Sequence, residues 1–124
     1  MSNYTVIENL ASAVEIPKDG TLSRTIHQDK NVKVVLFGFA GGQELSQHTA
    51  SVPAMVQIVQ GDVRFTFDGD ERELSAGSWA YMEANVPHAV YARTDAVMIL
   101  TMLTGVSQKQ TKLSPSQTNK ESVA

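Results

Sequence analysis

The residues in this chain best suited to chemistry are two histidines, His48 and His88. They lie in two glycine-led segments, which run from 42 to 61 (GQELSQHTASVPAMVQIVQG) and from 77 to 91 (GSWAYMEANVPHAVY). An imidazole can ligate a metal ion, and it can also donate and accept hydrogen bonds with an organic ligand. Because the chain holds no cysteine, a disulfide framework, a thiolate nucleophile and a thiolate metal site are all excluded.

The length and composition indicate a single globular domain. The chain has 124 residues, of which 42% are apolar and 19% charged, and its net charge is −3. It shows no basic patch, so we do not expect nucleic acid as a partner. No apolar run approaches the roughly 20 residues that a membrane helix needs, and the N-terminus lacks the pattern of a signal peptide. We therefore expect a cytoplasmic protein that does not engage a membrane.

Short runs of apolar and β-branched residues alternate with turn residues, which is typical of an all-β sandwich or barrel. We expect strands over 21–27, 32–40, 44–50, 54–60, 63–67, 71–74, 79–82, 87–92 and 96–104, with 4–10 as a candidate edge strand. An Asp-Gly hairpin turn is predicted over 68–70. The sequence thus predicts one domain over 1–104, and the polar composition of 105–124 predicts a disordered tail.

The two glycine-led segments resemble the two sequence motifs of the cupin superfamily. The matching positions are Gly42, His48 and Gly61 in the first motif, and Gly77 and His88 in the second. Glu83, Asn85 and Ala92 stand where the second motif has proline, glycine and asparagine. The resemblance covers roughly residues 32 to 104 and implies a cupin jelly-roll barrel of two antiparallel sheets. It also implies a homodimer, which is common in this family.

The same resemblance implies a metal site that has lost part of its ligand set. Metal-binding cupins supply three histidines and a glutamate, whereas here Ala50 takes the place of one histidine and Ala54 that of the glutamate. His48 and His88 remain as candidate ligands for a divalent transition metal, namely Fe, Mn, Ni, Cu or Zn. Four other side chains could complete such a site, and they are Gln57, Glu83, Glu44 and His27.

Three classes of function follow from this reading. The first is metal-free binding of a small molecule inside the barrel, because alanines in place of ligands widen the cavity and remove charge from it. The predicted pocket lining consists of His48, Ala50, Ala54, Val56, Ile58, Trp79, Met82 and His88. The second is a metal-dependent enzyme, such as a dioxygenase or an isomerase, with a two-histidine site. The third is a structural or regulatory dimer with a filled barrel, in which the histidines are inherited scaffold.

One strand offers an argument for dimerisation that does not depend on the family. The segment 32–40 (VKVVLFGFA) is nearly all apolar on both of its faces. The core covers one face of such a strand, and we expect a partner subunit to cover the other. Arg64 projects opposite the apolar face of its own strand and is expected to meet solvent or a partner subunit.

Overall fold

The computed structural model describes residues 3–106, which form nine strands and one short 3-10 helix. In chain order the elements are η1 (Leu10–Ser12), β1 (Thr21–Gln28), β2 (Lys33–Phe39), β3 (Glu44–His48), β4 (Ala54–Gln60), β5 (Asp62–Phe67), β6 (Asp70–Ser75), β7 (Trp79–Met82), β8 (His88–Ala92) and β9 (Ala96–Met102). All nine strands predicted within 21–104 are present, and β4 and β7 match their predicted bounds end to end. The candidate edge strand over 4–10 was wrong, because this segment has no strand structure.

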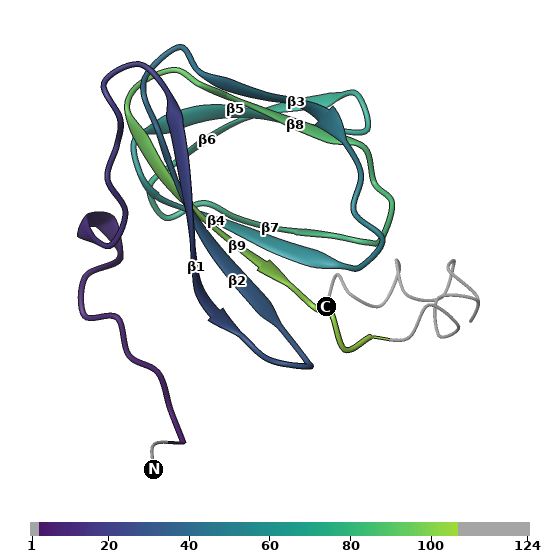
Figure 1. Ribbon diagram of the computed structural model, residues 1–124. Coiled ribbons are helices and arrows are strands. Elements are labelled where there is room, and N and C mark those ends of the chain that lie inside the picture. Colours follow the sequence, from purple (N-terminus) through teal and green to yellow (C-terminus); the bar gives the residue numbers. More distant parts are fainter. Residues whose placement is uncertain (1–2, 107–124) are drawn as a thin grey trace.

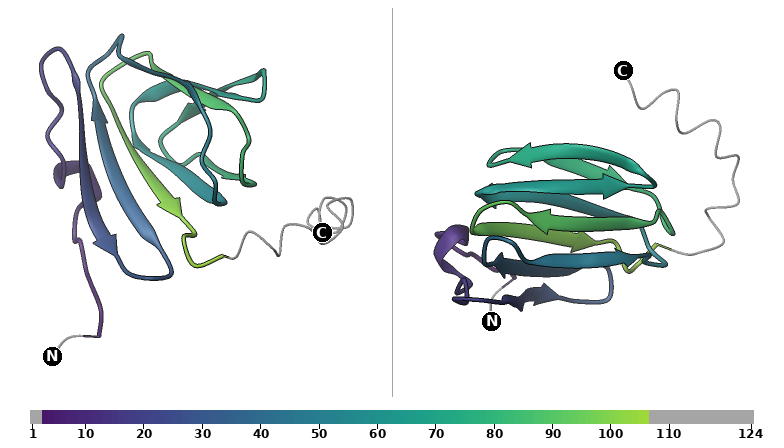
Figure 2. Two further views of the ribbon diagram at one scale, coloured as in Figure 1. Left: turned by 45° about the vertical axis from the view of Figure 1, so that its right-hand side comes forward. Right: turned by 90° about the horizontal axis from the view of Figure 1, so that it is seen from above.

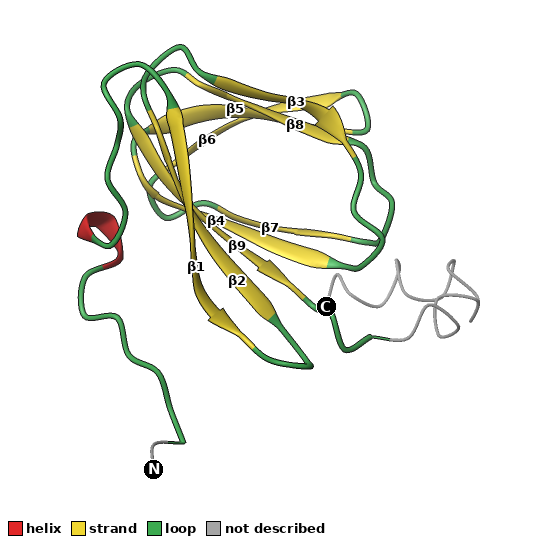
Figure 3. Cartoon of the chain, in the orientation of Figure 1, coloured by secondary structure: helices red, strands yellow, loops and turns green. Residues whose placement is uncertain are grey.

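The strands form two antiparallel sheets that face each other, which confirms the predicted jelly roll (Figures 1 and 3). The five-stranded sheet has the order β1-β2-β9-β4-β7, and the four-stranded sheet has the order β3-β8-β5-β6. Figure 2 shows the early strands β1 and β2 at one side of the molecule, away from the four-stranded sheet. Apart from the hairpins β1–β2 and β5–β6, successive strands lie in opposite sheets, and the loops gather at the two ends of the barrel.

The predicted Asp-Gly hairpin joins β5 to β6. Asp68 and Gly69 both have positive φ, at 50° and 86°, as the two central residues of a type I′ turn require. This turn lies at the same end of the barrel as His88, because Phe67 and His88 are register partners across β5 and β8. We call this end the mouth.

The opposite end of the barrel is the packed end. Phe39, Val63, Ala92 and Ala96 lie there with 0% exposure, and all four belong to the main hydrophobic cluster between the sheets. Alternating side chains of each strand point into this cluster because successive residues of a strand face opposite sides. The core therefore begins at the packed end and extends toward the mouth, where Phe67, Leu100 and Met102 are only partly buried.

A second hydrophobic cluster lies on the outer face of the five-stranded sheet. Leu36 and Val97 are fully buried there under Val14 of the N-terminal segment, with Leu10 and Ile16 beside it. This overturns our sequence argument for a dimer: the second apolar face of 32–40 is covered by the chain's own N-terminal segment and needs no partner subunit. The homodimer itself stays a prediction.

The described residues 3–106 contain no helix long and apolar enough to cross a membrane. Of the predicted tail over 105–124, only Gly105 and Val106 are described, so the tail prediction lies almost wholly outside the described residues.

Candidate functional site

Two imidazoles meet at the mouth of the barrel. His48, at the end of β3, and His88, at the start of β8, are register partners, and their ring centroids lie 4.3 Å apart with planes inclined by 59°. The pairing of β3 with β8 therefore brings together the histidines of the two motifs. His88 is only 8% exposed, whereas His48 is exposed. The pair thus has one member anchored in the protein and one open to solvent.

The hydrogen bonds of these rings define their tautomers. The Nδ1 atom of His48 lies 2.8 Å from the carbonyl oxygen of Ser46, and Nδ1 of His88 lies 2.9 Å from that of Val86. A carbonyl oxygen only accepts, so in both rings Nδ1 carries the proton and donates it. In a neutral imidazole the other nitrogen then holds a free lone pair. The site consequently offers two Nε2 acceptors on neighbouring rings.

Burial favours the neutral form of His88. It lowers the pKa of the His88 imidazole below its ordinary value of 6.5, and the nearby His48 lowers it further, while the hydrogen bond to the Val86 carbonyl acts in the opposite direction. His88 also stacks on Phe65, with ring centroids 6.0 Å apart and planes 12° from parallel. The stack on Phe65 and the hydrogen bond from Nδ1 together hold the Nε2 atom of His88 in a fixed direction.

Two loops form the rim of the mouth, the one between β3 and β4 and the one between β7 and β8. The backbone N–H of Asn85 donates to the carbonyl oxygen of Ala50 at 2.7 Å, which ties these loops together. Asn85 has a φ of 70°, a conformation that asparagine adopts more readily than other side-chain-bearing residues. This explains how asparagine can stand at a position where the resemblance leads us to expect glycine.

Most of the predicted pocket residues do lie on the inner face. Ala54, Val56, Ile58 and Met82 are 0–4% exposed and belong to the main hydrophobic cluster. They are packed against other side chains, so the interior beneath the histidines is apolar and largely filled.

Trp79 lies elsewhere, on the outer face of the five-stranded sheet. It is 59% exposed, and its register partner on β4 is the exposed Gln57. Its inclusion in the predicted pocket lining was wrong, because Trp79 does not face the barrel interior. The signal was available in the sequence: Trp79 and Met82 are three residues apart in one strand, so they face opposite sides.

Sequence reasoning missed two aromatic residues near the histidines. Phe65 stacks on His88, and Phe67 stacks on Phe65 with centroids 4.4 Å apart. Their alternation showed that Phe65 and Phe67 share a face, but their closeness to His88 depends on the register of β5 against β8. That register is not visible in a single sequence.

The described residues do not fit a site for a divalent transition metal. Among them no group of three or more histidine, aspartate and glutamate side chains is placed to hold an ion. Gln57 and Glu83 are exposed, Glu44 is a register partner of Tyr91 on the outer face, and His27 lies on the far sheet. Two imidazole nitrogens alone leave half of a tetrahedral ligand set unfilled.

A hollow of about 280 Å³ lies on the outer face of the four-stranded sheet, not at the histidine pair. Glu44, Thr66, Ala89 and Tyr91 line it together with Arg64. The Arg64 guanidinium lies 5.3 Å from the centre of the Tyr91 ring and 3.7 Å from a carboxylate oxygen of Glu73. Arg64 thus projects outward, as the alternation of its strand predicted.

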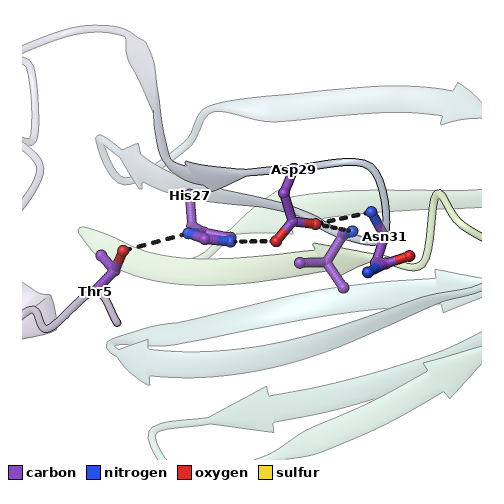
Figure 4. Close-up of polar contacts among 5 residues, drawn as sticks. Thr5, His27, Asp29 and Asn31 are labelled. Atoms are coloured by element: carbon purple, nitrogen blue, oxygen red, sulfur yellow. Dashed lines mark hydrogen bonds and ion pairs between the residues drawn. The ribbon is translucent and has the colours of Figure 1, made fainter. Parts of the chain in front are cut away.

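His27, the third histidine, belongs to a polar cluster on the outside of β1 (Figure 4). Its Nε2 lies 2.8 Å from Oδ2 of Asp29, and its Nδ1 lies 3.4 Å from the hydroxyl oxygen of Thr5. The hydrogen bond from His27, with those from the backbone N–H groups of Asn31 and Val32, lowers the pKa of Asp29 to about 2. This cluster fixes a surface turn and does not reach the barrel interior.

Two antiparallel sheets closed into a short jelly roll, with a histidine pair at one mouth, define a small barrel protein of the cupin type. The comparisons with known proteins agree, because the family model described as a cupin domain matches residues 35–104, more than half of the chain. The chain belongs to this family.

Solved structures similar to this chain share the same fold. A conserved protein of unknown function from Streptococcus pyogenes is 29% identical, with 86% of this chain and 93% of that chain covered and a TM-score of 0.75. An RmlC-like cupin protein from Desulfovibrio desulfuricans is 27% identical over 82% of this chain and 98% of that one, with a TM-score of 0.73. A search of curated proteins finds no match.

A more distant likeness is to a salicylate 1,2-dioxygenase variant from Pseudoaminobacter salicylatoxidans. It is 12% identical, with 77% of this chain and 30% of that chain covered and a TM-score of 0.66. At this identity the likeness concerns the fold alone, because one fold hosts many unrelated chemistries.

Proposed function

We propose that this cupin binds a small, mostly apolar molecule at the mouth of its barrel, and that the ligand donates a hydrogen bond to an Nε2 atom of the His48–His88 pair. The observation that carries the proposal is the state of the two rings. Both Nδ1 protons are held by backbone carbonyls, so both Nε2 atoms are acceptors. A ligand that itself carries a donor, such as a hydroxyl or an amine, complements them.

The surroundings of the pair restrict the ligand further. Partly buried Phe67, Leu100 and Met102 belong to the same end of the barrel, and they offer apolar and aromatic contact. Within residues 3–106, the hydrogen bonds and ring contacts of the two imidazoles involve the Ser46 and Val86 carbonyls, the partner imidazole and Phe65, and no basic side chain. The matching ligand therefore has an apolar body and a hydrogen-bond donor for the Nε2 acceptors.

The proposal is tested with phenol and anisole as a matched pair of probes. Both present the same ring, but only phenol carries a donor. The single O–H proton of phenol can exchange between the two Nε2 acceptors, so we expect phenol to perturb the side-chain ¹⁵N resonances of both histidines in NMR spectra, and anisole to leave them unchanged. His48→Ala removes an exposed acceptor and should abolish the phenol effect at His88 without unfolding the protein. Equal effects of the two probes, or none from phenol, would contradict the proposal.

The alternative is a metal-dependent cupin enzyme with a reduced two-histidine site. Elemental analysis of protein purified without a metal-affinity tag distinguishes this enzyme from the metal-free binding protein. One equivalent of Fe, Mn, Ni, Cu or Zn per chain, lost in His48→Ala, would favour the enzyme and displace the metal-free binding protein.

A further inference from the structure

The hollow on the outer face of the four-stranded sheet lies beside an irregularity of the edge strand β3. Between the register pairs Leu45–Val90 and His48–His88, β3 has two residues where β8 has only Ala89. The edge strand therefore carries a β-bulge opposite Ala89, and bulges at sheet edges often re-aim side chains. Because the alanine side chain is short, its larger neighbours stand above it and enclose a hollow of about 280 Å³.

One wall of the hollow presents a guanidinium whose hydrogen-bond donors are unused. Arg64 lies over the Tyr91 ring, 5.3 Å from its centre, and its Nε atom lies 3.7 Å from a carboxylate oxygen of Glu73, beyond hydrogen-bond distance. Arg93 occupies both oxygens of that carboxylate, with hydrogen bonds of 2.6 and 2.8 Å. Arg64 is thus held by the ring while its planar fork stays free to bind a carboxylate with two parallel hydrogen bonds.

The opposite wall presents an exposed carboxylate, that of Glu44. Glu44 on β3 and Arg64 on β5 are both register partners of Tyr91 on β8, so the three residues form one row across the sheet. Two strand spacings, roughly 10 Å, separate the Cα atoms of Glu44 and Arg64. Among the ion pairs within residues 3–106, none involves Glu44. The hollow therefore holds a positive and a negative group that do not neutralise each other.

The surface between these two groups carries no further charge. Of the described residues that line the hollow, only Glu44 and Arg64 are charged, and the floor and sides between them include Ala89, Thr66 and Ser46. A simple anion would meet the Glu44 carboxylate, and a simple cation the Arg64 guanidinium, with like charge. A molecule with one charge of each sign matches both walls.

We propose that this hollow binds a small zwitterion of the ω-amino acid class. Its carboxylate lies on the Arg64 guanidinium, its ammonium group on the Glu44 carboxylate, and its short aliphatic chain crosses Ala89. In an α-amino acid both charges are attached to one carbon, so a longer spacer suits two walls that stand on either side of a strand. The site lies on the other side of the sheet from the barrel interior, and it does not depend on the ligand proposed for the histidine pair.

Three probes with the same carbon chain test the charge requirement, namely 5-aminopentanoate, pentanoate and pentylamine. Pentanoate lacks the ammonium group, and pentylamine lacks the carboxylate. In NMR titrations of the full chain, we expect 5-aminopentanoate to cause its largest shifts at Thr66, Ala89 and Tyr91. Each singly charged probe should bind about fivefold or more weakly, because it loses one charge-assisted hydrogen-bonding group. Largest shifts at His48 and His88 would place the binding at the mouth and overturn the proposal.

Two variants test which wall holds which charge. Arg64→Gln should remove the preference for 5-aminopentanoate over pentylamine, and Glu44→Gln should remove the preference over pentanoate. The control combines Arg72→Gln with Glu8→Gln, which removes the same two charges from exposed positions outside the hollow and should leave all the affinities unchanged. Equal binding of the three probes, no shifts around the hollow, or unchanged preferences in the Arg64 and Glu44 variants would also overturn the proposal.

Discussion

The packed end and the mouth of the barrel are built from the same strands but from different kinds of residue. At the packed end, Ile58, Val63 and Ala96 are completely buried and carry no polar side-chain atom. At the mouth, His88 is buried at 8% exposure and His48 is exposed, with each Nδ1 held by a backbone carbonyl. One end therefore holds the fold together, while the other end has polar groups free to engage a ligand.

The contrast between the two ends is tested most strongly by removing volume at the packed end. Ile58→Ala leaves a cavity in the main cluster at its packed end and should lower the free energy of unfolding by about 2–5 kcal/mol. Urea denaturation followed by circular dichroism measures this effect. The matched change at the mouth, His48→Ala, removes an exposed side chain and should cost less than about 0.5 kcal/mol. If the two variants lost similar free energies of unfolding, the two ends of the barrel would contribute equally to stability.

A smaller effect is expected at the turn that closes the packed end between β4 and β5. Gly61 has a φ of 87°, and a Cβ there would overlap the carbonyl oxygen of Asp95 and lie 2.8 Å from the Cα of Ala96. Gly61→Ala should therefore lower the free energy of unfolding by about 1–3 kcal/mol. Gly69→Ala is a suitable control, because its φ of 86° is similar but a Cβ there would meet no atom within 4 Å. If both variants lose the same free energy of unfolding, the positive φ accounts for the whole loss and the close contact at Gly61 contributes nothing.

The smallest effect concerns how the stability of the protein depends on pH through His88 at the mouth. The folded state depresses the pKa of His88, so the unfolded chain binds the proton more tightly. The folded state therefore keeps its full stability, as far as His88 is concerned, at pH values above the ordinary pKa of 6.5. It loses stability as the pH falls from 6.5 through the pKa of His88 in the folded state. His88→Phe keeps a ring against Phe65 but cannot titrate, so its stability should vary less with pH across this window. Thermal melts at several pH values measure the difference, and parallel profiles for both proteins would contradict it.

The sequence predicted those parts of the structure that local patterns determine. Alternating and β-branched runs located the strands, and Asp68-Gly69 located a hairpin, because both depend on a few neighbouring residues. The pairing of His48 with His88 was also predictable, through their resemblance to the cupin motifs. What these patterns do not contain is register, so the stack of Phe67, Phe65 and His88 was not foreseen.

The N-terminal segment shows a second kind of structure that the sequence patterns could not predict. Leu10, Val14 and Ile16 have no regular strand or helix spacing, and their role appears only when β2 and β9 form the surface that they cover. The apolar second face of β2 correctly predicted that this face needs a cover. Its cover could not be identified, because a residue in the same chain and a residue in a partner subunit satisfy the same physical need.

The position of β9 has a consequence for how the chain reaches its native state. This last strand lies between β2 and β4, so it alone joins the β1–β2 hairpin to the β4–β7 pair. During synthesis the five-stranded sheet stays in two separate parts until residues 96–102 have emerged. Such late, long-range pairing is slow because the intervening loop must first be closed. The chain therefore completes its sheet in one late step, and a nascent chain stalled before residue 96 presents unpaired edges of β2 and β4 to its surroundings.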